Sequence, residues 1–439
     1  MSSIVVKDAE ETKSLVWFRN DLRINDNLAL NSALSAPGKV IGFYCFNLSM
    51  FKMTNLGFPK IDKFRAKFLL ETIKNLKEDL KRINITLIIK IGDPVKELTK
   101  IILQQKIENV FLQKEWTQEE VDEEDKLKSN CNNLNFNTFY SQFLYDPDDL
   151  DINNISNVFT NFRKHCEKKL KVKDLVEPPK KLLKDNLLTD DYLVPSLLDL
   201  GLEDFEIDSR SAFKFKGGHD AAKQRLDFYL WQSKKINFYK QTRNGLIGQD
   251  YSSKFSSWLS NGSISAREIF WEIKDYEKNI LKNQSTYWLI FELIWRDFFK
   301  YISMKYRNKI FKIGGILEKD YHWNTDNKIF DKWVDGLTNE PFVNANMLEL
   351  KYTGWMSNRG RQNVASYLAK ELNIDWRWGA RYFESQLIDY DVHSNYGNWM
   401  YVSGVGNDPR DRKFNIKFQA ERYDPTNKFQ KIWLQTRIF

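Results

Sequence analysis

Short apolar runs alternate with helical patterns over the first 150 residues of the chain. Four runs predict β-strands, at Ser14–Phe18, Val40–Phe46, Ile85–Ile91 and Asn109–Leu112, and Ile61–Ile83 carries apolar side chains at helical spacing. Because strands that alternate with helices form a parallel sheet with crossover helices, residues 1–150 predict a Rossmann-like α/β domain. A ligand crevice is expected at the carboxyl ends of its strands. The G-x-G-x-x-G fingerprint of an NAD-binding domain is absent after the first strand.

The pattern changes in the middle of the chain. From about residue 168 to residue 215, Pro178, Pro179 and Pro195 lie among dense charges without clear periodicity, which is typical of a long connector. Strand patterns nearly vanish afterwards, and helical patterns dominate from Gly218 to about Trp399. The sequence therefore predicts an α/β domain over residues 1–150, a connector over 151–217 and an all-α domain over 218–439.

The composition is that of a globular protein. Hydrophobic residues make up 42%, but the most apolar segment, Trp288–Trp295, contains Glu292 and is followed by Arg296 and Asp297, so no membrane span is expected. The first thirteen residues lack the apolar core of a secretory signal and the Arg-rich character of a transit peptide. Three cysteines, far apart and odd in number, favour a reducing compartment. The expected location is the cytoplasm.

Charge and aromatic content indicate the class of partner. The formal net charge of +8 favours nucleic acid, because binding to phosphates releases counterions, while a lysine-rich solvated surface is the alternative. Aromatic residues make up 15% of the chain, a supply that suits stacking on bases or on a flat cofactor as well as core packing. The four histidines show no metal-binding spacing such as HExxH, so no metal is predicted.

Two segments of the second half combine polar and aromatic residues. Asp250–Leu259 is rich in serine, whose hydroxyl groups can hold phosphate or can simply cap a helix. In Trp288–Phe299, Glu292 shares a helical face with Trp295 and Arg296. Since a buried carboxylate needs a partner, Glu292 either pairs with Arg296 or faces a ligand.

Two later segments carry amides and charges. In Thr353–Gln362, donors from Asn358, Arg359 and Arg361 either surround an acceptor-rich ring or a phosphate, or belong to a surface loop. Leu387–Tyr401 holds carboxylates and amides that would also suit Mg²⁺ or Ca²⁺. Its spacing is not that of an EF-hand, which disfavours the metal alternative.

Ordered motifs over nearly the whole chain resemble those of the cryptochrome/photolyase family. The opening Val16–Arg23, followed by Asp26 and Asn27, resembles that of photolyases and cryptochromes. The segments that look like the DASH branch in particular are Phe58–Lys60, Phe68–Glu71, Phe159–Lys164, Tyr239–Gly245, Met356–Ser366 and Gly404–Arg410. Three positions outside the expected site depart from the family pattern, namely His219, Ser257 and Asn344.

The resemblance implies a photolyase-type α/β domain followed by an all-α domain that binds FAD. The residues at positions that would hold the phosphates and ribitol are Tyr239, Ser252, Ser253, Lys254 and Ser256. The residues at positions that would surround the isoalloxazine are Asn358, Arg361, Asp389, Asp391 and Asn395. Asn395 would face the flavin N5, where a neutral amide can accept a hydrogen bond from the protonated nitrogen of reduced flavin.

The resemblance also implies light-driven repair of cyclobutane pyrimidine dimers in DNA by an electron from excited FADH⁻. Glu292 would hydrogen-bond the thymine edges, and Arg359 would meet phosphate. Trp295 and Tyr401 would flank the dimer, with Tyr401 standing where the family's usual repair pocket has a second Trp. Because a smaller ring stacks less on a lesion flipped out of a duplex, single-stranded or looped DNA is the expected substrate.

Two further groups follow from the resemblance. Trp323, Trp376 and Trp399 match the electron-relay tryptophans that photoreduce the flavin, although each would also suit a core. A folate antenna, 5,10-methenyltetrahydrofolate, is implied for this branch. Glu115 and Glu119 lie in the corresponding acidic segment.

Other functions use the same architecture. A blue-light photoreceptor would share the flavin and the relay, but signalling cryptochromes often carry long C-terminal tails, and this chain stops at Phe439. The (6-4) photoproduct branch has a His-His pair where this chain has Ser357 and Asn358. A nucleic-acid-binding flavoprotein without catalysis is the third possibility. No oligomer motif is evident, so a monomer is expected.

Overall fold

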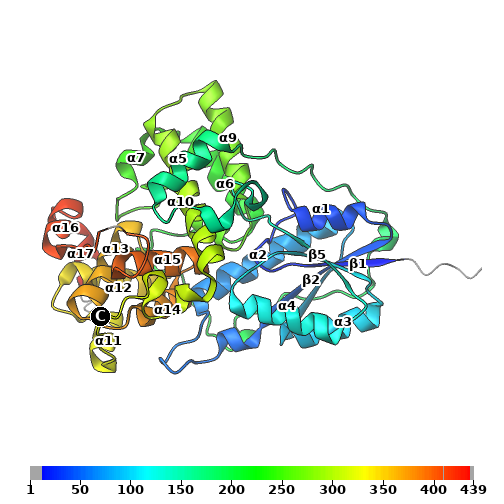
Figure 1. Ribbon diagram of the computed structural model, residues 1–439, viewed down its shortest axis with the longest axis horizontal. Coiled ribbons are helices and arrows are strands. Elements are labelled where there is room, and N and C mark those ends of the chain that lie inside the picture. The colour runs from blue at the N-terminus through cyan, green and yellow to red at the C-terminus, as the bar shows by residue number, and fades with distance from the viewer. Residues whose placement is uncertain (1–11, 409, 436–439) are drawn as a thin grey trace, which may run out of the picture.

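The structure is a computed structural model that describes residues 12–408 and 410–435. An α/β part is followed by a helical part, which confirms the predicted fold class (Figure 1). Residues 1–11, most of the segment assessed above for a signal or transit peptide, lie outside the described residues. So does Pro409 of the last DASH-like motif. Among the described helices, none is both long and apolar enough to cross a membrane.

The α/β part is built on a parallel sheet of five strands in the order β3-β2-β1-β4-β5. The strands are β1 (Lys13–Trp17), β2 (Lys39–Asn47), β3 (Leu87–Gly92), β4 (Asn109–Gln113) and β5 (Asn135–Phe139). The helices are α1 (Leu28–Ser35), α2 (Lys63–Arg82), α3 (Pro94–Gln105) and α4 (Gln118–Asn130). The four predicted strands and the predicted helix are confirmed with small shifts at their ends. β5 was not predicted, because this edge strand is polar and only half-buried.

Both faces of the sheet are covered by helices. Val16 and Phe18 pack into the core under α1 and α2, whereas Leu15 and Trp17 pack into the core under α3 and α4. This alternation is the period of two expected for a strand, and the double cover is what a parallel sheet requires. The carboxyl ends of the strands point toward the helical part (Figure 1).

The connector is packed along the α/β part. The segment predicted as connector, residues 151–217, contains the helix α5 (Phe159–Lys169) and, after it, no long helix or strand among its described residues. The Asn186 side chain donates to the backbone carbonyls of Val40 and Asn84 and accepts the N–H of Val40. These bonds hold the connector against the ends of β2 and α2. The exact domain boundaries, after residues 150 and 217, remain predictions.

The helical part surrounds a long central helix, α10. Its helices are α6 (His219–Asp227), α7 (Tyr239–Thr242), α8 (Ser256–Ser260), α9 (Ala266–Asn279), α10 (Gln284–Tyr306), α11 (Asn327–Val334), α12 (Pro341–Thr353), α13 (Asn358–Ser366), α14 (Trp376–Gln386), α15 (Val392–Ser403), α16 (Ile416–Tyr423) and α17 (Lys428–Leu434). A capping box starts α10, in which the Asn283 side chain accepts the N–H of Thr286 and the Thr286 hydroxyl accepts the N–H of Asn283.

Two adjacent residues of α10 join the helical part to the α/β part. The fully buried carboxylate of Asp297 accepts the backbone N–H groups of Leu144 and Tyr145, each at 2.9 Å. The neighbouring Arg296 donates to the carbonyl of Gln142 in the same loop. The loop after β5 is thus fixed to the middle of α10.

A second joint depends on the backbone of Gly262. Its φ is +74°, in the left-handed region, and its carbonyl accepts a hydrogen bond of 2.9 Å from Arg23. A Cβ at this position would lie 2.1 Å from the carbonyl oxygen of Asn20 in the α/β part. Only glycine therefore fits this close approach.

We expect Gly262→Ala to destabilise the protein through this joint. The left-handed conformation costs about 1–2 kcal/mol for a residue with a Cβ, and the contact with Asn20 adds to it. Gly201→Ala is the matched control, because Gly201 has a φ of +77° but nothing within 4 Å of its Cβ position. Thermal melting should show the larger decrease for Gly262→Ala. Equal decreases would mean that the contact with Asn20 carries no stability.

Candidate functional site

Arg361 on α13 and Ser256 on α8 meet at a single carboxylate. Arg361 Nη2 lies 2.9 and 3.0 Å from the two oxygens of Asp389, and the Ser256 hydroxyl donates to Asp389 at 2.7 Å. Asp389 is buried. The structure thus brings together three of the predicted site residues from distant segments.

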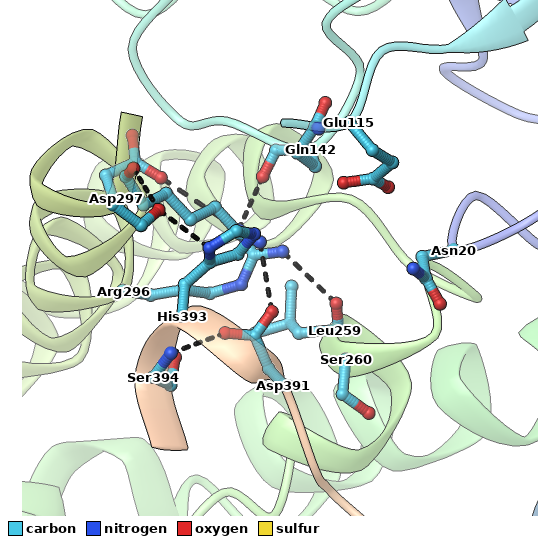
Figure 2. A network of polar contacts seen from close by, with 12 residues as sticks. Asn20, Glu115, Gln142, Leu259, Ser260, Arg296, Asp297, Asp391, His393 and Ser394 are labelled. Atoms are coloured by element: carbon cyan, nitrogen blue, oxygen red, sulfur yellow. Dashed lines mark hydrogen bonds and ion pairs between the residues drawn. The ribbon is translucent and has the colours of Figure 1, made fainter. Parts of the chain in front are cut away.

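The second predicted carboxylate, Asp391, caps α15 and pairs with α10. One oxygen accepts the N–H of Ser394 at 2.8 Å, and the other accepts from Lys300 at 3.0 Å (Figure 2). Burial opposes ionisation, but the charge of Lys300 keeps the pKa of Asp391 below its ordinary value. Because Asp389 and Asp391 are both paired with cationic side chains, the arrangement does not favour the Mg²⁺ or Ca²⁺ alternative.

Asn395 lies one turn after Asp391 on α15. Its Nδ2 donates to the carbonyl of Ala380 at 2.9 Å, and its side chain is largely buried. Its Oδ1 has no hydrogen-bond donor among the described residues. The amide is therefore oriented with an unused acceptor.

The serine-rich loop before α8 is held by Arg225 on α6. Arg225 is buried and donates to the carbonyls of Ser252 and Ser253, each at 3.0 Å, and to the carboxylate of Asp250 at 2.8 Å. Sequence reasoning missed Arg225, since a single arginine on a helix gives no signal of its long-range partners.

Lys254 in this loop is a buried amine without a hydrogen-bond partner among the described residues. Its side chain is 2% exposed, its φ is +67°, and its Nζ lies 3.4 Å from the ring centre of Tyr251 and 4.4 Å from that of Trp355. Burial lowers the pKa of Lys254 well below its ordinary value, and the nearby Glu349 opposes this shift only in part. An anion is the missing partner that this position fits.

Glu292 on α10 does not pair with Arg296. It forms an ion pair with Arg243, which follows α7. The predicted alternative of an internal Glu292–Arg296 pair is wrong, because Arg296 instead donates to the carbonyls of Gln142 and Leu259 (Figure 2). Arg243 was not predicted as part of the site.

Trp295 and Tyr401 lie next to one another. Their ring centres are 6.2 Å apart and their planes are nearly perpendicular, at 89°. Phe159 of α5 stacks on Trp295 with ring centres 3.6 Å apart and planes inclined by 10°. Phe159 thus fixes the plane of Trp295, a role that the sequence did not suggest although Phe159 opens a DASH-like motif.

The end of α7 brings Arg359 to the same face as Glu292. Asn244 follows Arg243 in the chain and accepts a hydrogen bond of 3.1 Å from Arg359. Arg359 is half-buried against the ring of Tyr423, whereas the predicted Asn358 is exposed at the start of α13. Tyr239 is buried at the start of α7, and burial raises the pKa of its hydroxyl to about 12.

The three predicted relay tryptophans run from the interior toward the surface. Trp399 and Trp376 are buried, and Trp323 is half-buried. The Trp399 ring lies where a Cβ of Gly379 would be, one turn after Trp376 on α14. Asn324, beside Trp323, forms a parallel β-bridge with the segment that precedes α14. These contacts bring Trp399 against α14, which begins at Trp376, and the backbone beside Trp323 against the segment before α14.

A cavity of about 740 Å³ opens at the carboxyl ends of the strands, between the α/β and helical parts. The predicted crevice is thus confirmed. Glu115 in its wall is buried, accepts from Gln113 at 2.8 Å, and has a pKa that burial raises to about 7. Figure 2 shows Glu115 and Asn20 across from the polar residues of the helical part. Glu119 also lines the cavity but is exposed and paired with Lys60.

Comparison with known proteins decides the family. Residues 14–181 match DNA photolyase, and residues 288–436 match the FAD binding domain of DNA photolyase. Cryptochrome DASH of Xenopus laevis is 44% identical over 95% of this chain and 81% of its own length. The chain belongs to the DASH branch of the cryptochrome/photolyase family.

Solved structures of the family share the fold. The cryptochrome of Synechocystis sp. PCC6803 superposes with a TM-score of 0.92 at 42% identity, covering 96% of this chain and 88% of its own. A class III photolyase from Agrobacterium tumefaciens superposes with a TM-score of 0.81 at 26% identity, covering 98% and 88%. The helical part of this DASH chain is therefore the FAD-binding domain of the family.

Two unsatisfied groups of the DASH chain fit FAD. The buried Nζ of Lys254 needs an anion, which the diphosphate supplies. The unused Oδ1 of Asn395 can accept a hydrogen bond from a protonated ring nitrogen. The residues present thus complement both ends of the cofactor.

We expect Lys254→Met to stabilise the FAD-free chain. Folding without an anion buries the Lys254 amine where its charged form is disfavoured, because burial lowers its pKa well below the ordinary 10.5. The penalty is fully present below the pKa of the folded state and vanishes as pH rises toward 10.5. The thermal midpoint of the FAD-free variant should thus exceed that of the parent most at neutral pH.

Lys126→Met, on the exposed surface of α4, is the matched control. It removes an amine of the same kind without relieving burial, and its thermal midpoint should follow that of the parent at every pH. A midpoint for Lys254→Met at or below that of the parent would contradict the expectation.

Proposed function

We propose that this DASH cryptochrome is a light-dependent lyase that splits cyclobutane pyrimidine dimers in single-stranded or looped DNA. The observation that carries the proposal is the pairing of Glu292 with Arg243, one helical turn before Trp295 on α10. A carboxylate that accepts the N–H of a pyrimidine, a cation for negative charge and a stacking surface are the groups that such a lesion needs. The +8 net charge agrees with a DNA partner.

The cofactor is held by residues from both ends of the helical part. Reduced FAD, when bound, supplies in blue light the electron that opens the cyclobutane ring. Lys254, with Ser252 and Ser253, holds the diphosphate, while Tyr239 and Ser256 hold the ribitol side. Lys254→Met should then weaken FAD binding roughly ten- to a hundredfold, because a charge-assisted hydrogen bond contributes about 1.5–3 kcal/mol.

The ring end of the cofactor is oriented by fixed amides and carboxylates. The Asn395 Nδ2 donates to the carbonyl of Ala380, so its Oδ1 is the atom that would accept a hydrogen bond from the protonated N5. The Asp389–Arg361 pair and Asp391, held by Lys300, surround the rest of the ring with groups that cannot reorient freely. Such preorganised dipoles lower the cost of charge changes during electron transfer.

The lesion replaces Arg243 as the partner of Glu292. The Glu292 carboxylate then accepts the N3–H of a thymine, and the released guanidinium of Arg243 stays close to the carbonyl oxygens that become negative on reduction. Trp295, backed by Phe159, supplies the stacking surface. Arg359 binds a backbone phosphate at the same face.

Preference for single strands follows from the geometry of the two rings. Tyr401 stands perpendicular to Trp295, so the lesion gains one broad stacking face rather than two. Flipping a base from a duplex costs a few kcal/mol, and this reduced stacking offsets less of it. Single-stranded DNA avoids most of the cost.

A monomer in the cytoplasm remains the prediction for assembly and location.

The cavity between the two parts is the proposed place of a folate antenna. Its volume of about 740 Å³ lies within the range of sites for small cofactors. The buried carboxylate of Glu115 offers acceptors for the N–H groups of a pterin, whereas the exposed Glu119 lies nearer the rim.

The proposal is tested by repair of a thymine dimer in single-stranded and duplex oligonucleotides, with prereduced protein, in blue light and in darkness. We expect light-dependent repair that is faster on the single strand. Equal rates on both substrates would remove the single-strand preference. No repair, with FAD bound and photoreducible, would favour a photoreceptor instead.

Glu292→Gln separates catalysis from DNA binding in the same assay. The variant should lose at least tenfold in repair rate, while its affinity for single-stranded DNA stays within about threefold, since most of that affinity comes from phosphate contacts. Glu108→Gln, exposed in the α/β part, is the control. Loss of DNA affinity together with repair would show that Glu292 acts mainly in binding.

For the antenna, we expect Glu115→Gln to weaken binding of 5,10-methenyltetrahydrofolate roughly tenfold, as one charge-assisted hydrogen bond is lost. The parent should also bind folate less tightly as pH falls below about 7, because Glu115 becomes protonated there. Folate fluorescence measures both effects. Glu119→Gln, at the exposed rim, should have less effect, and equal effects would place the pterin away from Glu115.

A further inference from the structure

We propose that Tyr321 is the terminal electron donor of the tryptophan relay and that Asp411 receives its proton. The inference rests on the proposed relay of Trp323, Trp376 and Trp399. It adds a residue that neither the motifs nor the family resemblance assigned. The relay would then end on a neutral phenoxyl radical instead of a charged indole.

Tyr321 packs directly against the outermost tryptophan. The ring centres of Tyr321 and Trp323 are 6.0 Å apart, and their planes are inclined by 75°. Both side chains are half-buried, in contrast to Trp376 and Trp399 in the interior. Tyr321 thus continues the series of rings to the protein surface, over a distance no longer than other aromatic contacts in this part of the chain.

The Tyr321 hydroxyl already has a proton acceptor. It donates to Asp411 at 3.2 Å and accepts from Lys319 at 3.0 Å. Lys370 donates to the other oxygen of Asp411. Burial opposes the ionisation of Asp411, but the hydrogen bond and charge of Lys370 keep the pKa of its carboxyl below the ordinary value. Asp411 is therefore a carboxylate at neutral pH, ready to take a proton.

The charges around the two rings favour a neutral end point. The ammonium groups of Lys319 and Lys370 lie 5.3 and 5.2 Å from the centre of the Tyr321 ring. A positive hole left beside two ammonium groups is disfavoured by their charge. When Tyr321 gives its proton to Asp411, the added positive charge neutralises that carboxylate, and the ring beside the ammonium groups stays uncharged.

The step balances in electrons and protons. In light, one electron leaves Trp323 through Trp376 and Trp399 to the photoexcited oxidised flavin, which is the oxidant. One electron then passes from the phenol of Tyr321 to the oxidised indole of Trp323, which becomes neutral again. The O–H bond of Tyr321 breaks at the same time, and its proton moves to a carboxylate oxygen of Asp411. Tyr321 has then lost one electron and one proton.

The test is a flash experiment on the full chain loaded with oxidised FAD. In the parent, transient absorption should show the indole radical decaying into a phenoxyl radical, which electron paramagnetic resonance identifies. In Tyr321→Phe the phenoxyl signal should be lost, and the radical pair should recombine at least tenfold faster. Tyr352→Phe, which changes an exposed tyrosine outside the series of rings, should behave like the parent.

Asp411→Asn tests the proton step separately. It keeps both rings in place but removes the acceptor, so formation of the phenoxyl radical should slow at least severalfold while the indole radical still forms. An unchanged radical decay in Tyr321→Phe, with the indole radical present, would overturn the inference and leave the relay intact. Absence of any indole radical in the parent would overturn the predicted relay of Trp323, Trp376 and Trp399, and Tyr321 with it.

Discussion

A fully buried carboxylate on the central helix ties the two halves of this molecule together. Asp297 is fully buried on α10, where an unpartnered charge would be costly, and the N–H groups of Leu144 and Tyr145 are what make it tolerable. Burial nevertheless raises the pKa of Asp297 to about 6, so these bonds offset the loss of water only in part. If the loop after β5 moved away from α10, the Asp297 carboxylate would lose both N–H partners. The cavity between the halves owes its shape to that constraint.

The same helix sets the spacing of the site. Glu292 and Trp295 face the proposed lesion, Asp297 holds the α/β part, and Lys300 holds Asp391 beside the proposed ring site. At 1.5 Å per residue, Glu292 and Lys300 lie roughly 12 Å apart along the axis. A rigid element thus carries both the substrate contact and the support of the cofactor. A loop fixes the positions of its side chains less firmly than a helix does. The one loop of the site, before α8, is held by hydrogen bonds from the buried Arg225.

Periodicity was sufficient for most of the fold, because β1 to β4 and α2 bury one or two continuous apolar faces. It failed for β5, whose polar edge position leaves no apolar alternation. Family motifs placed the carboxylates and amides of the site, but not the partners that position them. Arg243 reaches Glu292, Phe159 reaches Trp295 and Arg225 reaches the serine loop only through tertiary packing, which local sequence does not encode. Of the two alternatives that helical spacing left open for Glu292, the pair with Arg296 is wrong.

Electrons and DNA approach the proposed flavin site from different sides. The substrate face lies between α10 and the end of α7, whereas Trp323 precedes α11 at the opposite end of the helical part (Figure 1). In the proposed function, bound DNA would therefore leave the outer end of the relay uncovered, and photoreduction would not require an empty lesion site. A photoreceptor would need only the relay side, and the Glu292–Arg243 pair would then have no use beyond packing. Because this pair is partly exposed and Glu292 lies one helical turn before Trp295, a ligand that replaces Arg243 gives the pair a function that packing alone does not.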